Sequence, residues 1–280
     1  CYCSYCIVPY VRGREISRKP ESILEQIEEL VKEGCLEVTL LGQNVNSYGR
    51  DLEEAVTFTD LLKRIDKVNG LKRIRFMTSN PMYFQQELVD FAAVSDKVCK
   101  HFHIPVQSGS DSILKAMNRR YTVADYLGIV RHIRKLLPGA SITTDIIVGF
   151  PGETEEDFKK TLGLMEQVGF DSAYTFKYSS REKTKAALME GQVEDWVKEA
   201  RLEVLMRVQE KINKLKNEML IENKFEILVE SRQMKDGEAC VTGRTDTNKI
   251  VIADTDAPVG SFVNIEITAA NPHSLAGSLY

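Results

Sequence analysis

Between residues 20 and 178 the sequence alternates amphipathic helical stretches with short apolar runs, and few folds accommodate this alternation. The apolar runs are typical of buried strands and span residues 36–41, 72–78, 101–106, 141–148 and 172–178. The predicted helices lie at residues 20–34, 58–68, 84–94, 112–117 and 123–137. Strands that alternate with helices in this way favour an α/β fold with a parallel sheet.

A polar or glycine-bearing loop follows each predicted strand. These loops include GQNVNSYG at 42–49, SNP at 79–81, QSGSD at 107–111 and GFPGET at 149–154. In parallel α/β folds the loops after the strands gather on one rim, and ligands bind there. We therefore expect this rim to be the functional face. Thr154 and Asp157 have the spacing of a capping pair and predict a further helix after the last of these loops.

The last third of the sequence changes character. Residues 193–223 are rich in Glu, Lys and Arg and predict one long helix. Short β-type runs follow at 225–229, 239–242, 250–253 and 262–268, and turn-forming residues separate them. This pattern predicts a small antiparallel β-barrel. We divide the chain into residues 1–216, an α/β domain with its long helix, and residues 217–280, the β domain.

Three of the six cysteines, Cys1, Cys3 and Cys6, lie within the first six residues. Crowded thiolates in a chain without a secretory signal predict a metal site rather than a disulfide. Zinc usually needs a fourth ligand, and the histidines are scattered through the sequence. Three thiolates suit a 4Fe-4S cluster in which one iron has no protein ligand, because each cysteine binds one iron. The alternative is that small cysteines pack near a terminus.

The other cysteines and the charge distribution lead to further predictions. Cys35, Cys99 and Cys240 lie next to apolar runs and are expected to pack in the core. The formal net charge of −4 gives no overall basic field, and the β domain is net acidic. Local basic residues either contact RNA or form a solvated charged face, and they are Arg12, Arg14, Arg119, Arg181 and Lys183. No apolar run of about 18 residues predicts a membrane span, so we expect a cytoplasmic protein without a membrane partner.

The ordered motifs resemble one enzyme family. The segment CSYCIVPYVRG at 3–13 resembles the cluster loop of the radical S-adenosylmethionine methylthiotransferases. Four motifs follow in that family's order: GQNVNSY at 42–48, TSNP at 78–81, PVQSGSD at 105–111 and DIIVGFPGET at 145–154. GRTD at 243–246 and NPHSL at 271–275 resemble its TRAM domain. The resemblance covers essentially the whole chain and implies a partial (βα)6-type parallel barrel of the radical SAM class, followed by a TRAM-like barrel.

The resemblance also implies cofactors and their contacts. Cys1, Cys3 and Cys6 would hold a 4Fe-4S cluster whose open iron binds S-adenosylmethionine. Tyr5 would lie near the cofactor adenine, although a packed aromatic fits the sequence equally well. The other candidate cofactor residues are Gln43, Asn44, Gln107, Ser108, Asp145 and Gly149. Each of these also has a simpler reading as a turn or loop residue.

Among the family's branches, the loops at 42–48 and 78–81 are most similar to the MiaB type, which acts on tRNA. That branch adds a methylthio group to carbon two of an isopentenylated adenosine beside the tRNA anticodon. The alternatives are a threonylcarbamoyl-adenosine tRNA, a ribosomal-protein side chain, or a non-catalytic RNA-binding module with structural zinc. The expected partners are a tRNA anticodon stem-loop and a reductant protein, and the expected state is a monomer.

The sequence departs from the family in two ways. The family's cluster motif is C-x3-C-x2-C, whereas this chain reads C-x-C-x-x-C, as if two residues were missing between Cys1 and Tyr2. The family also has a strand before this loop and, upstream, a domain with a second 4Fe-4S cluster. We therefore interpret the sequence as part of a longer protein. We expect that the present chain alone does not complete methylthiolation.

Overall fold

The computed structural model describes residues 3–235 and 238–280. Five parallel strands form its α/β domain: β1 (Glu37–Leu40), β2 (Arg73–Phe76), β3 (His101–His103), β4 (Ser141–Val148) and β5 (Ser172–Lys177). β1 pairs with β2, and β3, β4 and β5 form a second sheet. A bridge from Ile74 to Val98 and a hydrogen bond from Ser79 N to His103 O (2.9 Å) connect the two sheets. The predicted parallel α/β fold is confirmed.

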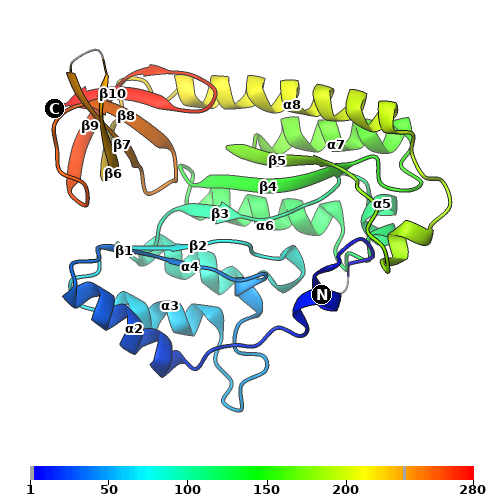
Figure 1. Ribbon diagram of the computed structural model, residues 1–280, viewed down its shortest axis with the longest axis horizontal. Coiled ribbons are helices and arrows are strands. Elements are labelled where there is room, and N and C mark those ends of the chain that lie inside the picture. The colour runs from blue at the N-terminus through cyan, green and yellow to red at the C-terminus, as the bar shows by residue number, and fades with distance from the viewer. Residues whose placement is uncertain (1–2, 236–237) are drawn as a thin grey trace.

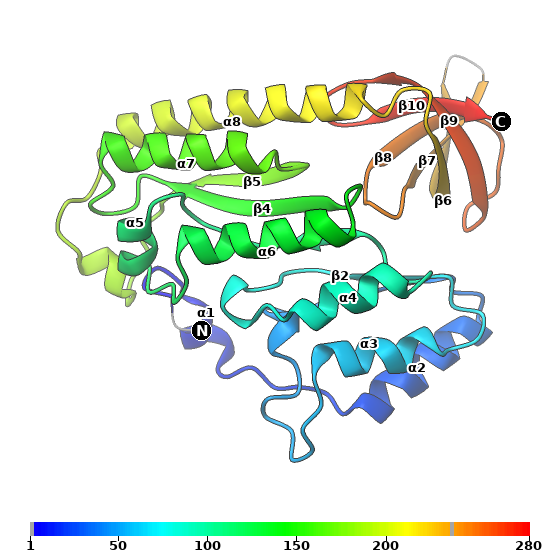
Figure 2. The ribbon, with the colours of Figure 1, turned by 180° about the vertical axis from the view of Figure 1, so that it is seen from behind.

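Helices connect the strands and cover one side of them, as Figure 2 shows for α4, α6 and α7. They are α1 (Val8–Arg12), α2 (Pro20–Lys32), α3 (Phe58–Asp66), α4 (Gln86–Val94), α5 (Asp111–Ala116), α6 (Val123–Leu136) and α7 (Glu155–Val168). Three short 3-10 turns are η1 (Val45–Ser47), η2 (Pro81–Tyr83) and η3 (Lys185–Leu188). The predicted capping pair of Thr154 and Asp157 is confirmed, and it satisfies the first orphan N–H groups of α7.

Side chains on the barrel strands alternate between an apolar and a polar environment. The positions that face the helices are buried hydrophobics, and they include Ile74, Phe76, Phe102, Ile142 and Ile146. The alternate positions point to the barrel interior and are polar, and they include Arg73, Arg75, His101, His103, Thr143 and Asp145. The apolar core therefore lies between strands and helices, while the barrel interior carries the polar chemistry.

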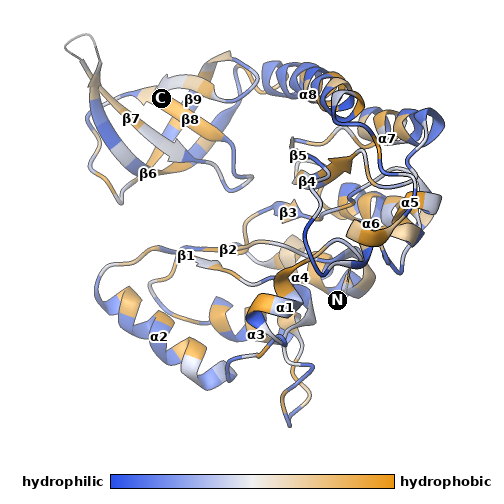
Figure 3. Ribbon diagram, turned by 45° about the vertical axis from the view of Figure 1, so that its right-hand side comes forward, coloured by the Kyte–Doolittle hydropathy of each residue, from blue (hydrophilic) through white to orange (hydrophobic). Residues whose placement is uncertain are grey.

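Helix α8 (Asp195–Glu218) packs against β5 and leads to the C-terminal barrel (Figures 1 and 3). The prediction that this helix extends to residue 223 is wrong. The chain turns after Glu218, Glu222 takes a left-handed backbone (φ 69°), and strand β6 begins at Lys224. None of the helices in the described part of the chain is long and apolar enough to cross a bilayer.

The C-terminal barrel is closed and has the strand order β10-β8-β7-β6-β9. Its strands are β6 (Lys224–Lys235), β7 (Glu238–Arg244), β8 (Ile250–Asp254), β9 (Phe262–Ala270) and β10 (Leu275–Leu279). The predicted small barrel is confirmed, but sequence patterning missed β10. Its five residues include a glycine and only two large apolar residues, so they carry little strand propensity. β10 runs parallel to β8 and antiparallel to β9.

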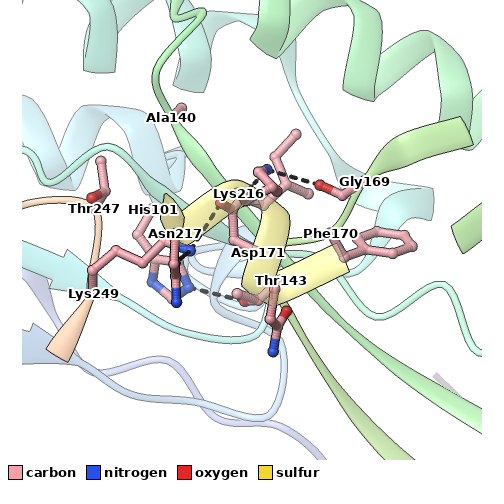
Figure 4. A network of polar contacts seen from close by, with 12 residues as sticks. His101, Ala140, Thr143, Gly169, Phe170, Asp171, Lys216, Asn217, Thr247 and Lys249 are labelled. Carbon is pink, nitrogen blue, oxygen red and sulfur yellow. Dashed lines mark hydrogen bonds and ion pairs between the residues drawn. The ribbon is translucent and has the colours of Figure 1, made fainter. Parts of the chain in front are cut away.

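Buried charges join the small barrel to the N-terminal ends of the parallel strands (Figure 4). Asp171 accepts from Lys216 Nζ at 2.7 Å, and Lys249 Nζ lies 3.2 Å from it. Burial alone raises the pKa of Asp171, but the two lysines outweigh it and the pKa is lowered overall. Arg75 donates to Thr245 O at 2.7 Å, and Arg73 donates to Arg244 O at 2.8 Å.

Candidate functional site

The cysteine loop, residues 3–6, lies at the opposite ends of the strands from the small barrel (Figure 1). Ser4 holds this loop in place with three hydrogen bonds. Its N–H donates to Met117 O (3.0 Å), its hydroxyl donates to Ala116 O (2.8 Å), and its carbonyl accepts from Ala186 N (2.8 Å). Because Ser4 is buried, the loop is fixed between the end of α5 and the turn η3.

Cys3 and Cys6 are half-buried free thiols within one turn, in which Cys6 N donates to Cys3 O at 3.2 Å. Cys1 and its spacing to Tyr2 lie outside the described residues. Among residues 3–235 and 238–280, no group of three or more His, Cys, Asp or Glu side chains is arranged to hold a metal. Two unpaired thiols in an anchored turn fit thiolate ligation of an iron-sulfur cluster, with Cys1 as the expected third ligand.

Arg119 and Tyr5 meet directly beside the cysteine loop. Arg119 Nη2 donates to the Tyr5 hydroxyl at 2.7 Å, and burial raises the pKa of this phenol. The Tyr5 ring also packs edge-on against Phe150, with centroids 6.3 Å apart. A cavity of about 190 Å³ is lined by both Cys3 and Arg119. In the described part of the chain Arg119 Nε is buried and has no hydrogen-bond partner. A guanidinium with spare donor capacity therefore faces a cavity next to a candidate cluster ligand.

Three strands end in the same unusual backbone conformation. Thr78, Gln107 and Gly149 follow β2, β3 and β4, with φ values of 69°, 72° and 71°. Such a conformation costs on the order of 1–3 kcal/mol for a residue other than glycine, and strain of this kind concentrates at functional sites. At Gly149 a Cβ atom would lie 2.3 Å from Lys198 Cγ, so the loop also needs glycine for space.

A buried ion pair supports the loop after β4. Arg201 Nη1 of α8 lies 2.8 Å from Glu153 Oε2, and the same carboxylate accepts from Gly149 N at 2.6 Å. Burial raises the pKa of Glu153, although Gly149 and Arg201 oppose it. Sequence reasoning missed this pair because its members come from distant segments. The only available signal was an arginine within the predicted long helix.

Two family models match the chain: the Radical SAM superfamily over residues 2–165 and the TRAM domain over residues 223–280. The chain belongs to the radical SAM superfamily. Both assignments confirm the resemblance seen in the motifs. Membership implies a 4Fe-4S cluster and S-adenosylmethionine as cofactors.

The radical SAM chain is similar to curated proteins named tRNA-2-methylthio-N(6)-dimethylallyladenosine synthase. The protein from Moorella thermoacetica is 50% identical over 279 residues, which cover 99% of this chain and 63% of that protein. The protein from Clostridium botulinum (strain Langeland) is 51% identical over 278 residues, which cover 99% of this chain and 61% of that protein. The chain thus spans about three-fifths of the length of these relatives.

Two solved structures share the radical SAM fold. The methyltransferase TsrM from Kitasatospora setae superposes with a TM-score of 0.55 at 20% identity, covering 67% of this chain and 34% of that chain. Coproporphyrinogen III oxidase (HemN) from Escherichia coli superposes with a TM-score of 0.53 at 14% identity, covering 76% and 49%. At these identities the likeness supports the fold alone.

The radical SAM fold separates the predicted cofactor residues into several locations. Gln43 is exposed, and Asn44 is buried with Oδ1 accepting from Asn80 N at 3.3 Å. Gln107 is buried at the left-handed strand end. Ser108 Oγ lies 3.4 Å from Thr161 Oγ1 and is therefore turned toward α7 rather than the cysteine loop.

Asp145 lies in the middle of β4, inside the barrel, and Gly149 lies at its end. The Asp145 Oδ1 atom is 3.3 Å from His103 Nε2 of β3. Because a strand rises about 3.3 Å per residue, the two predicted residues of this stretch lie at different depths. Gly149 is at the rim with the cysteine loop, and Asp145 lies below it.

The predicted basic residues flank the cysteine loop, and all but one of them are exposed. Arg12 and Arg14 are exposed just after it, and Arg181 and Lys183 are exposed in the segment that leads to Ala186. The hydrogen bond between Ala186 N and Ser4 O brings this second segment against the loop. Arg119 differs because it is half-buried and bonded to Tyr5.

The remaining cysteines have the packing environment expected from the sequence. Cys99 and Cys240 are buried, and Cys35 is half-buried with Sγ 3.1 Å from Glu37 O. Burial raises the pKa of Cys99 to about 11, so its thiol stays protonated at neutral pH. A protonated buried thiol is a poor metal ligand and a poor nucleophile.

Proposed function

We propose that this chain is the radical SAM and TRAM portion of a tRNA methylthiotransferase that modifies carbon two of N6-dimethylallyl-adenosine beside the anticodon. One observation supports this above others. Free Cys3 and Cys6 lie in an anchored loop at the rim, in a chain half identical to relatives that carry this activity in their names. The threonylcarbamoyl-adenosine, ribosomal-protein and zinc-module alternatives have no comparable support.

The residues at the rim have roles in this proposal. Cys1, Cys3 and Cys6 would hold the 4Fe-4S cluster. When bound, the cluster and S-adenosylmethionine supply reductive cleavage of the sulfonium to a 5'-deoxyadenosyl radical. The fixed charge of Arg119 suits the carboxylate of the methionine moiety, because guanidinium–carboxylate hydrogen bonds are strong. Gly149 leaves space for close approach of the adenine to the backbone.

The remaining roles concern partners. We assign Tyr5, Gln43, Asn44 and Gln107 to the surroundings of S-adenosylmethionine, whereas Ser108, whose hydroxyl is turned toward α7 and accepts from Ser110 N, would support the loop. The exposed basic residues beside the cysteine loop would contact the phosphates of a tRNA anticodon stem-loop, and they are Arg12, Arg14, Arg181 and Lys183. A reductant protein would deliver the electron, and a second 4Fe-4S cluster would be held by an N-terminal domain. We expect the enzyme to act as a cytoplasmic monomer.

The test is nucleoside mass spectrometry on tRNA treated with the reconstituted full-length enzyme, reductant and S-adenosylmethionine. We expect the 2-methylthio derivative of N6-dimethylallyl-adenosine, and we expect Cys3→Ala to abolish it while Cys240→Ala retains it. Residues 1–280 alone should cleave S-adenosylmethionine without forming this product. Methylthiolation of a different nucleoside, or tRNA binding by a protein that contains zinc and no iron, would contradict the proposal.

A further inference from the structure

Two aromatic side chains of β5, Tyr174 and Phe176, are half-exposed, at 52% and 50% of their surface. Phe102 of β3, by contrast, is fully buried. Helix α8 packs on the outer face of β5, where Lys177 meets Glu199 at 2.8 Å. Because successive side chains of a strand point to opposite faces, Tyr174 and Phe176 face the barrel interior. The inner wall at β5 therefore presents two aromatic rings without an apolar cover.

A hydrogen-bond acceptor lies beside these rings. The parallel register places Asp145 opposite Tyr174 and Ile147 opposite Phe176. Asp145 Oδ1 contacts His103 Nε2, and Oδ2 has no partner among residues 3–235 and 238–280. The Asp145 side chain retains 28% exposure, so a ligand in the barrel can reach it. Aromatic faces and an acceptor oxygen thus share one wall.

His103 fixes the position of that acceptor. Its Nδ1 lies 3.0 Å from Thr143 Oγ1, and its ring packs edge-on against Tyr174 with centroids 5.7 Å apart. The imidazole is buried, and its Nε2 lies 3.3 Å from Asp145 Oδ1. The Asp145 carboxyl group therefore lies beside His103 and its register partner Tyr174.

The wall also lies close to the cysteine loop. Ile147, the register partner of Phe176, packs in the same small apolar cluster as Tyr5 and Phe150. Tyr5 directly precedes the candidate ligand Cys6. A ligand ring stacked on Phe176 would therefore lie near the end of the barrel where the radical would form. Asp145 would contact the edge of that ring that lies farther from the cysteine loop.

We infer that Tyr174, Phe176 and Asp145 form the binding site of the target adenine, an inference that rests on the proposed function. Unstacked RNA bases bind on aromatic side chains and are read through the hydrogen bonds of their edges. The exocyclic N–H of adenine is a donor, and Asp145 accepts it. That N–H and carbon two leave the six-membered ring in different directions, so a base hydrogen-bonded to Asp145 leaves carbon two free to face the cysteine loop. His103 is a positioning residue.

The first experiment exchanges a donor for an acceptor on the base. Anticodon stem-loop RNAs carrying N6-dimethylallyl-adenine (the adenine RNA) or O6-dimethylallyl-hypoxanthine (the hypoxanthine RNA, in which an ether oxygen replaces the exocyclic N–H) at the target position are titrated against the reconstituted holoenzyme, and binding is followed by fluorescence anisotropy. The wild-type protein should bind the adenine RNA about 10-fold or more tightly than the hypoxanthine RNA, because a charged acceptor faces the hypoxanthine oxygen. Asp145→Asn should abolish this preference, since its amide both donates and accepts.

The second experiment tests the aromatic surface. Phe176→Ala should weaken binding of the adenine RNA between about 5-fold and 150-fold, the range of base–aromatic stacking. Phe176→Trp, which keeps a stacking face, should restore most of the affinity. Trp196→Ala is the matched control, because Trp196 is 71% exposed on α8 outside the barrel. Its substitution should leave RNA affinity unchanged.

Equal binding of the two RNAs by wild type, an unchanged preference in Asp145→Asn, or full affinity in Phe176→Ala would overturn the proposed adenine-binding site. These readouts are binding constants and require no turnover. Failure of the proposed adenine-binding site is therefore distinguishable from failure of the proposed function. The proposed function is judged by the methylthiolated product that the wild-type enzyme forms. His103→Gln should reduce the adenine preference without affecting reductive cleavage of S-adenosylmethionine.

Discussion

The two ends of the parallel strands differ in how far a buried charge is compensated by other groups of the protein. At the N-terminal ends, Asp171 is surrounded by Lys216, Lys249 and the N–H of Ile142, and its charge is compensated within the protein. At the C-terminal ends, Glu153 and Arg201 form a compensated pair, but Arg119 contacts the Tyr5 hydroxyl and has no carboxylate partner in the described residues. The first arrangement fixes the small barrel to the α/β domain, and the second leaves capacity for a ligand. The comparison indicates that stability and chemistry are divided between the ends.

The largest expected effect at the stabilising end comes from Asp171→Ala. Removal of this buried carboxylate leaves two half-buried lysines without their charged partner, and breaking a buried ion pair typically costs about 3–5 kcal/mol. We expect the free energy of unfolding in urea to fall by that amount, while iron content per folded molecule is retained. Glu203→Ala, which removes one member of an exposed ion pair with Arg207 on α8, is the control and should have little effect. Equal behaviour of the two variants would break the proposed division.

Arg75→Ala should have the next largest effect. Arg75 is buried, donates to Thr245 O at 2.7 Å and pairs with Glu37 at 2.9 Å. Loss of a charged hydrogen bond between the domains should cost roughly 2–3 kcal/mol. We expect a protease to cleave the variant faster than the wild type between α8 and β6. Mass spectrometry of the fragments measures this cleavage. The surface variant Arg232→Ala, whose partner Asp256 is exposed, should be cleaved at the wild-type rate.

His101 gives a pH-dependent prediction at the same end. Burial, with His103 and Arg75 nearby, lowers the pKa of His101 to about 3, whereas an unfolded histidine titrates near about 6.5. Between these values the unfolded chain binds one more proton, so stability falls as the pH drops below about 6.5, by about 1.4 kcal/mol per unit. His101→Gln should remove this slope, measured by urea unfolding at several pH values. His132→Gln, at a half-buried position where the imidazole contacts Asp90, should retain it.

The smallest expected effect concerns the exposed charges at the rim. Arg181→Ala should weaken tRNA binding several-fold and reduce the slope of log affinity against log salt concentration by about 1, as expected for one phosphate contact. Lys224→Ala in the small barrel, where Lys224 pairs with Glu266, should change neither quantity. A larger effect from Lys224 would move the RNA surface from the rim to the small barrel.

Local sequence signals predicted much of this fold. The strand cores, the capping pair of Thr154 and Asp157, and the rim location of the motif loops follow from short-range patterns. The end of α8 was missed because residues 219–223, with the sequence MLIEN, contain no glycine or proline that would mark the end of a helix. Strand β10 was missed because its own residues have little strand propensity, and its pairing with β8 and β9 stabilises it instead.

The site was predicted less completely than the fold. The cysteine loop and its basic neighbours were found, because residue type and spacing carry that information. The contacts of Tyr5 with Arg119, of Glu153 with Arg201 and of Asp145 with His103 were not. Each joins segments far apart in the chain, and only the packed barrel brings them together. The direction of Ser108 toward α7 likewise depends on tertiary packing.

The central claim is that Cys3 and Cys6 at the rim hold the catalytic cluster. The most direct measurement is iron and acid-labile sulfide content, with electron paramagnetic resonance of the reduced protein before and after addition of S-adenosylmethionine. The account predicts about four irons and four sulfides for this site, a spectrum that changes with S-adenosylmethionine, and loss of both in Cys6→Ala but not in Cys240→Ala. A Cys6→Ala protein that keeps the cluster and its response to S-adenosylmethionine would contradict it.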